Sequence, residues 1–422
     1  MKTLFKWIGR FLALFFSIIG IICLAGLSWI LLQPALPQGS LKVNEEFIRS
    51  DTYRGVADSS LILVQQVASQ LGLPSISVAV SIDNERYWAV ALGKADIKEE
   101  KESVLETQYR AGSISKSMTG LAAAQLAQMG KLEIDAPIDQ YVSKFQGKPW
   151  QPSLRQLASH TGGIRHYAAP GHPAFFQEQF SQKHYDNIDD ALEMFIDDTL
   201  QYEPGTNFQY STHGFTLLSS AMEKATGESY LDLAMESVWV PSKMQSTAPD
   251  DMTVENLTRA KPYTRILKRM VHMEGPDPSY KWAGGGILTT PSDLVAMGGA
   301  FMTGQLGGIS PSSPEFLSVP LENDKPNPQN YAMGFRNDWE SELLGYSETV
   351  HVMHHGGSSP GGSSFLLLIP SDTLSAAAMT NLSIRQAWPL REAVYKIAGM
   401  FGREIRSQQL TYLPLLEAAE TR

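Results

Sequence analysis

The sequence predicts a mixed α/β (α+β) fold, with an antiparallel sheet flanked by helices, a helical lobe and one N-terminal transmembrane helix. Three observations predict it. Strand patterns lie at both ends of the body, helical patterns dominate the middle, and an uncharged apolar run stands near the N-terminus. This order implies one antiparallel sheet built from distant segments and covered by helices, with the helical block as a lobe of its own.

The N-terminus carries a candidate membrane anchor. Residues 11–32 form 22 consecutive residues without a charge, which at about 1.5 Å per residue cross a hydrocarbon core of roughly 30 Å. Lys2, Lys6 and Arg10 precede this run, and a basic flank places the N-terminus in the cytoplasm. We therefore predict a cytoplasmic tip and single-pass cell-membrane anchor over residues 1–33, with the rest extracytoplasmic (periplasmic in a bacterium). The alternative is a cleaved signal peptide, whose apolar region normally has about 7–15 residues.

The first part of the body combines a helix and a hairpin. Residues 34–55 are polar with Pro and Gly and are expected to form a stalk. A helix is predicted to end at Gly72, because apolar residues recur at helical spacing between residues 61 and 71. Residues 74–82 and 87–92 flank a polar turn and predict a β-hairpin.

Helical patterns dominate from the Ala- and Leu-rich residues 115–129 to about residue 275, and strand patterns return after three glycines. The clearest later elements are a helix, two strands joined by a turn and a last helix, over residues 215–225, 365–369, 374–379 and 391–402. We therefore predict one domain over residues 56–402, with a helical lobe at about 125–280 and a polar tail over residues 403–422.

Composition narrows the possible functions. The chain has a formal charge of −10, and from Glu45 onward 44 acids oppose 30 bases, so its acidic body argues against nucleic acid as a partner. The single cysteine, Cys23, excludes an intramolecular disulfide and cysteine-rich metal sites. The Gly-x-Ser-x-Gly, His-Glu-x-x-His and Gly-x-x-x-x-Gly-Lys motifs are missing, which removes the main support for an α/β-hydrolase, a zinc protease or a P-loop protein.

Ser113 and Lys116 give the sharpest chemical signal. They stand three residues apart at the start of a predicted helix, so their side chains share a face. Serine is a poor nucleophile until a base takes its proton, and a lysine amine can be that base when burial and neighbouring cations keep it neutral. The helix N-terminus also offers free N–H groups where an oxyanion can form. The alternative is an ordinary helix start with Ser113 as N-cap and a solvated Lys116.

Two further segments can contribute to such a site. Tyr210 precedes a helix and can relay a proton, while Thr212 can hydrogen-bond a substrate amide or the lysine; alternatively, Tyr210 only packs there and Thr212 caps the helix. His354 and His355 open a glycine-rich run before a predicted strand, where the backbone can approach a ligand and a histidine can steer a carboxylate or transfer a proton. The alternatives are a plain glycine-rich hairpin and a metal site made by these histidines with His351.

In their order and spacing, these motifs resemble the serine β-lactamase and penicillin-binding protein superfamily, in its class C-like branch, and within it the LACTB-type serine hydrolases. The similarity covers about residues 56–402 and rests on five segments: residues 113–116, 157–164, 203–212, 281–286 and 355–357. The resemblance implies a β-lactamase/transpeptidase-like fold and a serine hydrolase that works through an acyl-enzyme. Neither a metal nor an organic cofactor is needed by this mechanism.

The resemblance also implies roles for single residues. Ser113 is expected to be the acyl-accepting nucleophile, Lys116 its base and Tyr210 the second proton-transfer group. The backbone N–H groups of Ser113 and Ser358 would form the oxyanion hole. The residues expected to bind substrate are Thr212, His355, Gly357 and Ser358. The segment 160–162 mimics the His-Gly-Gly motif, and the resemblance implies a structural role for it.

Two departures from the family pattern affect the expected substrate. The second motif often ends in Asn where this chain has Thr212, as the LACTB-like branch also has. The third is often Lys-Thr-Gly where this chain has 355–357 as His-Gly-Gly. Without the permanent charge and the hydroxyl, carboxylate recognition should weaken. We therefore predict a membrane-anchored peptidase or esterase for small-molecule or peptide amides, esters or lactams. The alternatives are a D,D-carboxypeptidase or weak β-lactamase, and a non-catalytic ligand- or peptidoglycan-binding protein on the same fold.

Overall fold

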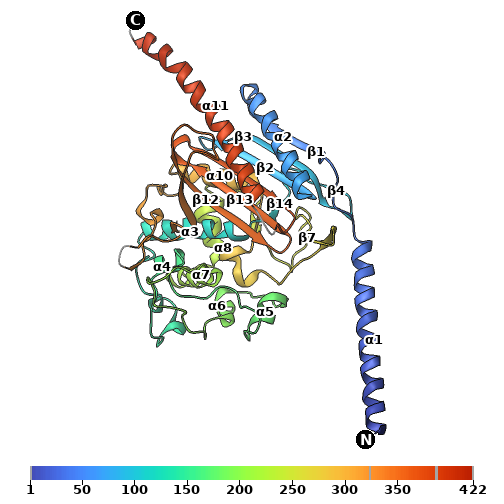
Figure 1. Cartoon of the computed structure of the whole chain (residues 1–422). Coiled ribbons are helices and arrows are strands. Elements are labelled where there is room, and N and C mark those ends of the chain that lie inside the picture. Colours follow the sequence, from blue (N-terminus) through green and yellow to red (C-terminus); the bar gives the residue numbers. More distant parts are fainter. Residues whose placement is uncertain (1, 323–324, 385–387, 421–422) are drawn as a thin grey trace.

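A nine-stranded antiparallel sheet forms the centre of the computed structural model, which describes residues 2–322, 325–384 and 388–420 (Figure 1). The strand order is β1-β3-β2-β14-β13-β12-β11-β10, with β4 paired to β3. The strands are Val43–Ile48 (β1), Ser75–Ile82 (β2), Glu85–Asp96 (β3), Lys101–Glu102 (β4), Tyr331–Ala332 (β10), Phe335–Glu340 (β11), Val350–Ser359 (β12), Gly362–Ile369 (β13) and Leu374–Thr380 (β14). Because β2 pairs with β14, the predicted sheet built from distant segments is confirmed.

Helices cover both faces of the sheet (Figure 1). Helices α2 (Arg54–Leu71) and α11 (Trp388–Glu420) pack on one face, and α10 (Pro291–Met302) packs on the other. The sheet residues alternate between the two cores, as a strand period of two requires. Leu367 belongs to the core under α2 and α11, while Leu366 belongs to the larger core that also takes in α3 (Ser115–Gln128).

The helical lobe packs against α3 on the side away from the sheet (Figure 1). Its helices are short, apart from α7, which begins at a Ser211 cap and ends at the left-handed Gly227. They are Leu154–Ala158 (α4), Phe175–Phe180 (α5), Ile188–Ala191 (α6), Thr212–Thr226 (α7), Tyr230–Ala234 (α8) and Trp282–Gly285 (α9). A small sheet joins β5 (Tyr109–Arg110), β9 (Ile287–Thr289) and β6 (Ala248–Pro249).

The segment predicted to be a stalk, residues 34–55, contains a strand of the main sheet and the start of α2. Residues 43–48 form β1, which pairs with β3 at the edge of the main sheet. Glu45 and Glu46, whose charges suggested an exposed segment, accept hydrogen bonds from the body. Glu46 accepts a bond of 3.0 Å from the Trp88 indole, and Glu45 accepts one of 2.9 Å from the Leu105 N–H. Phe47 packs on the core beside them.

Three other elements differ from the sequence predictions. The helical block contains a β-hairpin, β7 (Tyr263–Ile266) and β8 (Arg269–His272), whose turn residues Leu267 and Lys268 have positive φ without being glycine. Strands return after the three glycines as predicted, beginning with β9, but the unpredicted helix α10, capped by Thr290, lies between β9 and β10. Helix α11 continues past Gly402 to Glu420, and Arg406 on this extension pairs with Asp372 of the body.

Helix α1 (Lys2–Leu32) projects from the body (Figure 1). Over Leu14–Leu32 its mean hydropathy is 2.5 and none of it is buried. Within the part of the chain that the structure describes, it is the one helix that is long and apolar enough to cross a membrane.

Candidate active site

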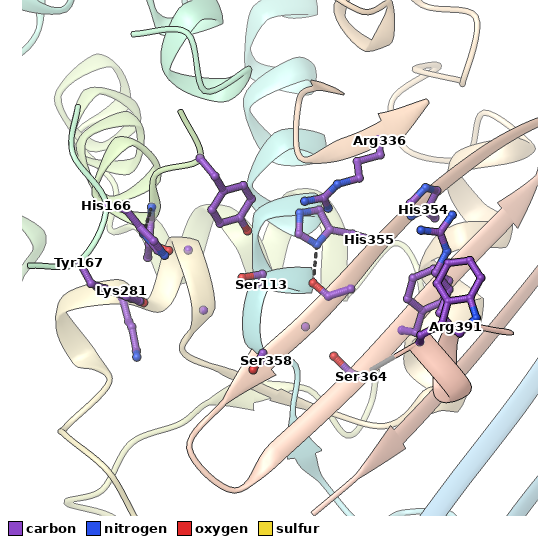
Figure 2. A pocket seen from close by; sticks show the side chains of 18 residues that line it. Ser113, His166, Tyr167, Lys281, Arg336, His354, His355, Ser358, Ser364 and Arg391 are labelled. Atoms are coloured by element: carbon purple, nitrogen blue, oxygen red, sulfur yellow. Dashed lines mark hydrogen bonds between the residues drawn. The ribbon is translucent and has the colours of Figure 1, made fainter. Parts of the chain in front are cut away.

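Ser113 lies in a 3₁₀ turn, Gly112–Ile114, between β5 and α3. It lines a cleft of about 620 Å³ whose walls come from the lobe on one side and from β12 on the other (Figure 2). Gly112 has φ +53°, and a Cβ there would stand 2.7 Å from the Ser358 nitrogen. The serine turn and β12 are therefore in backbone contact, which brings the Ser358 amide next to Ser113.

Lys116 is fully buried one helical turn further on. Its Nζ lies 3.3 Å from the Ser113 Oγ and 3.1 Å from the Thr212 Oγ1, and it also donates to the Gly284 carbonyl. All three partners are neutral. Burial lowers the pKa of Lys116 well below its usual 10.5, and the nearby Lys281 and Arg336 lower it further. The predicted alternative of a Ser113 cap with a solvated Lys116 is therefore wrong.

Tyr210 lies next to Lys116 and Ser113. The Lys116 Nζ lies 4.8 Å from the centre of its ring. Burial raises the pKa of Tyr210, and the Ser113 side chain and Arg336 oppose that rise only in part. Among the described residues, its buried hydroxyl has no partner at full hydrogen-bond geometry. The phenol thus stays protonated and free to donate.

Thr212 points at the lysine rather than capping α7. Ser211 is the cap, since its Oγ accepts a 2.9 Å bond from the Gly214 N–H. The Thr212 N–H donates to His166 Nδ1 at 3.2 Å. Because its amide is held in this way, the Thr212 hydroxyl is fixed toward Lys116.

The two neighbouring histidines of β12 point to opposite faces of the sheet, although both line the cleft. His355 Nε2 lies 2.8 Å from the Tyr331 hydroxyl, and its Nδ1 lies 2.7 Å from the Gly356 carbonyl. His354 instead bonds Asp338 at 2.7 Å. Burial, with Arg336 nearby, lowers the pKa of His355 well below 6.5, so this ring is neutral and its nitrogens are already engaged.

The metal-site alternative finds no support in this geometry. His351 bonds Asn337 at 3.1 Å, so the three histidines each have a separate partner. Among the residues that the structure describes, no group of three or more potential ligands gathers anywhere.

Gly357 is required by close packing. A Cβ at this position would stand 2.0 Å from both the Ala111 carbonyl and the Ser364 Oγ. The Ser364 hydroxyl also donates to Ala111 at 2.7 Å. A side chain at residue 357 would therefore push β12 away from the serine turn and move the Ser358 amide.

Sequence reasoning missed three cations that line the cleft. Lys281 belongs to the segment 281–286, which carries part of the family resemblance, but no role was predicted for it. Arg336 and Arg391 lie in segments that carry no recognisable motif. Arg336 lies over the Tyr210 ring at 5.7 Å. Among the described residues that line the cleft there is no Asp or Glu, although the chain as a whole carries a charge of −10.

His160 lies behind the site, outside the cleft lining. Its Nδ1 accepts a 3.1 Å bond from the Ser211 N–H, and its ring lies 4.2 Å from that of Tyr210. These contacts fix the position of Tyr210, in keeping with the structural role expected for the segment 160–162.

Comparison with known proteins gives a consistent result. A family model described as Beta-lactamase matches residues 62–397. The human serine beta-lactamase-like protein LACTB, mitochondrial, is 29% identical over 395 residues, covering 75% of this chain and 72% of its own. The solved D-stereospecific amidohydrolase from Streptomyces sp. superposes with a TM-score of 0.65 at 23% identity, covering 79% of this chain and 98% of its own. The solved hydrolase EstCE1, described as having promiscuous acyltransferase activity, gives 0.66 at 19%, covering 82% and 100%.

Proposed function

Because this chain belongs to the beta-lactamase family, whose model matches most of it, we propose that it is a membrane-anchored, extracytoplasmic serine hydrolase that forms an acyl-enzyme on Ser113. One observation carries the proposal. A fully buried lysine, without a carboxylate partner among the described residues, stands 3.3 Å from the hydroxyl of a serine that lines a cleft.

The neutral amine of Lys116 suits the role of base. Such an amine has two N–H bonds and one lone pair. The Thr212 Oγ1 and the Gly284 carbonyl accept the two N–H groups, which leaves the lone pair for the Ser113 hydroxyl. Lys116 then takes the serine proton as Oγ attacks the substrate carbonyl, and the Ser113 and Ser358 N–H groups bind the oxyanion.

Tyr210 suits the role of acid. Its raised pKa keeps the phenol protonated, so it can donate a proton to the leaving amine or alcohol as the tetrahedral intermediate collapses. It regains that proton from Lys116, which lies beside its ring. Water then hydrolyses the acyl-enzyme and releases Ser113.

The substrate we propose is an amide or ester of a peptide or small molecule. A specific observation also favours the second candidate, a D,D-carboxypeptidase or weak β-lactamase. The described residues that line the cleft include Lys281, Arg336 and Arg391 but no acid. Such a lining attracts a substrate carboxylate, and it supplies the positive charge that the neutral His355 lacks.

The anchor is supported by the ends of α1. Trp7 and Trp29 are both exposed and stand about 33 Å apart along the helix axis. Tryptophan favours the two membrane–water interfaces, about 30 Å apart. A helix with this pattern is expected to stay in the membrane.

Active-site labelling tests the hydrolase proposal. A fluorophosphonate or fluorescent penicillin should attach to the full-length protein at Ser113, as mapped by peptide mass spectrometry. Labelling should vanish in Ser113→Ala and persist in Ser358→Ala, which loses a cleft hydroxyl but keeps the backbone N–H. Labelling that survives in Ser113→Ala would contradict the proposal. Labelling of Ser113 without turnover of any ester, amide or lactam would favour the non-catalytic binding protein.

A further inference from the structure

The end of α1 is fastened directly to the β7–β8 hairpin. The candidate membrane-spanning part of α1 ends at Leu32. The Gln33 carbonyl accepts a 3.2 Å bond from Arg269, the Pro34 carbonyl accepts a 2.9 Å bond from the Met270 N–H, and Ala35 forms a bridge with Arg269. No free linker therefore separates the anchor from the body, and the hairpin must lie where α1 leaves the bilayer.

The hairpin presents the residue types that favour a lipid headgroup layer. Leu267 at its tip is 61% exposed, and Arg265 and Lys268 beside it are exposed and basic. The turn holds Leu267 and Lys268 at φ +47° and +61°, a conformation that is uncommon for residues other than glycine. An exposed apolar tip flanked by cations is the pattern of an interfacial membrane contact.

Helix α5 adds an aromatic pair to this surface. Phe176 and Phe180 are four residues apart on one face and are 74% and 65% exposed. The end of α5 is joined to the segment that follows β8, because the Asp277 N–H donates to Ser181 and the Gln182 amide donates to Gly275. In Figure 1, α5 and β7 both lie on the side of the body along which α1 runs. Neither phenylalanine lines the cleft, so a bound substrate would not cover them.

We propose that the hairpin tip and the exposed face of α5 dock on the bilayer that holds α1, which fixes the orientation of the catalytic body on the membrane. A lipid surface is the occupant that fits, since the anchor holds this face at the interface and since its basic and apolar groups match anionic headgroups and acyl chains. The inference rests on the anchor in the proposed function, but it does not depend on the chemistry at Ser113.

Site-specific fluorescence in liposomes tests this docking. The full chain carrying Cys23→Ser has no other cysteine, so an NBD label can be placed at Leu267→Cys or Phe180→Cys. Met129→Cys, at the C-terminal end of α3, is the matched control because Met129 is also 58% exposed. Leu24→Cys reports on the anchor itself. The proteins are reconstituted in phosphatidylcholine–phosphatidylglycerol vesicles, with or without lipids spin-labelled near the headgroup.

The labels at residues 267 and 180 should shift to the blue and be quenched by the spin-labelled lipids, because both would lie in the headgroup region. The label at residue 129 should change in neither respect. Equal emission and quenching at residues 129, 180 and 267 would overturn the docking. If the label at residue 24 is still quenched in that case, the anchor stands and the docking alone fails. If residue 24 also escapes quenching, the anchor and the docking both fall, while labelling at Ser113 still decides the hydrolase chemistry.

Discussion

Two buried cations in this molecule are held in opposite ways. Arg165 in the lobe bonds Glu178 at 2.6 Å and also pairs with Asp198. Lys116, beside Ser113, is buried at least as deeply, but among the described residues it bonds only hydroxyl and carbonyl oxygens. Its charged neighbours are Lys281 and Arg336. A guanidinium keeps its charge and must be paired, whereas an amine can shed its proton. The paired cation therefore stabilises the fold, and the unpaired one has the environment that the proposed base requires.

The largest effect is expected from Lys116→Met. Removal of the base should lower kcat for an ester substrate by about 10⁴-fold or more, as when one member of a nucleophile–base unit is lost. The free energy of unfolding should stay the same or rise, because a desolvated amine is replaced by an apolar chain of similar length. Steady-state kinetics and urea unfolding measure both quantities. A variant that keeps activity, or that unfolds much more readily, would contradict this view of Lys116.

Arg165→Met should behave in the reverse way. It leaves Glu178 buried without the guanidinium, with His213 and a backbone N–H as its remaining partners, so the free energy of unfolding should fall by about 3–5 kcal/mol. Arg155→Met is the matched control, because Arg155 pairs with the Asp135 side chain, which is 71% exposed. Such exposed pairs contribute about 0–1 kcal/mol to the free energy of unfolding. Equal losses in the two variants, measured by urea unfolding, would mean that burial of the pair is unimportant.

The pH dependence of the free energy of unfolding tests whether Lys116 is neutral in the folded protein. The unfolded chain binds a proton at Lys116 with a pKa near 10.5, while the folded chain binds it only at lower pH. Between the lowered pKa and 10.5 the unfolded state holds more protons, so stability contributed by this site rises with pH, by at most about 1.4 kcal/mol per pH unit. Lys116→Met should flatten this slope relative to the wild type. An unchanged slope would show that Lys116 is charged in the folded protein.

A smaller effect is expected at Arg336. This guanidinium is one of the cations that lower the pKa of Lys116, so Arg336→Gln should raise that pKa and move the rising limb of the pH–rate profile to higher pH. Arg391→Gln is the control, since Arg391 lines the same cleft but is not among the groups that lower this pKa. The same pH–rate profile in the wild type and both variants would show that Arg336 does not lower the pKa of Lys116.

Strand and helix patterns predicted the fold, and the resemblance of the ordered motifs to a known superfamily pointed to Ser113, Lys116 and Tyr210 as one site. The sequence could not predict Arg336, which reaches the cleft only because β11 pairs with β12 in a register that sets Arg336 opposite His354. The β1 strand was missed for a related reason. Glu45 and Glu46 suggest a solvent-exposed segment, because their hydrogen-bond partners lie far away in the sequence. The cap of α10 at Thr290, followed by Pro291, was a readable signal that the apolar character of the segment obscured.

The most direct test of the central claim is the pH dependence of Ser113 phosphonylation in the full-length protein, followed by mass spectrometry with a fluorophosphonate. The rate should rise with pH and level off well below pH 10.5, and in Lys116→Met it should be slow with no such inflection. A wild-type rate that inflects only near 10.5, or that matches the rate of Lys116→Met, would show that the buried lysine is not the neutral base.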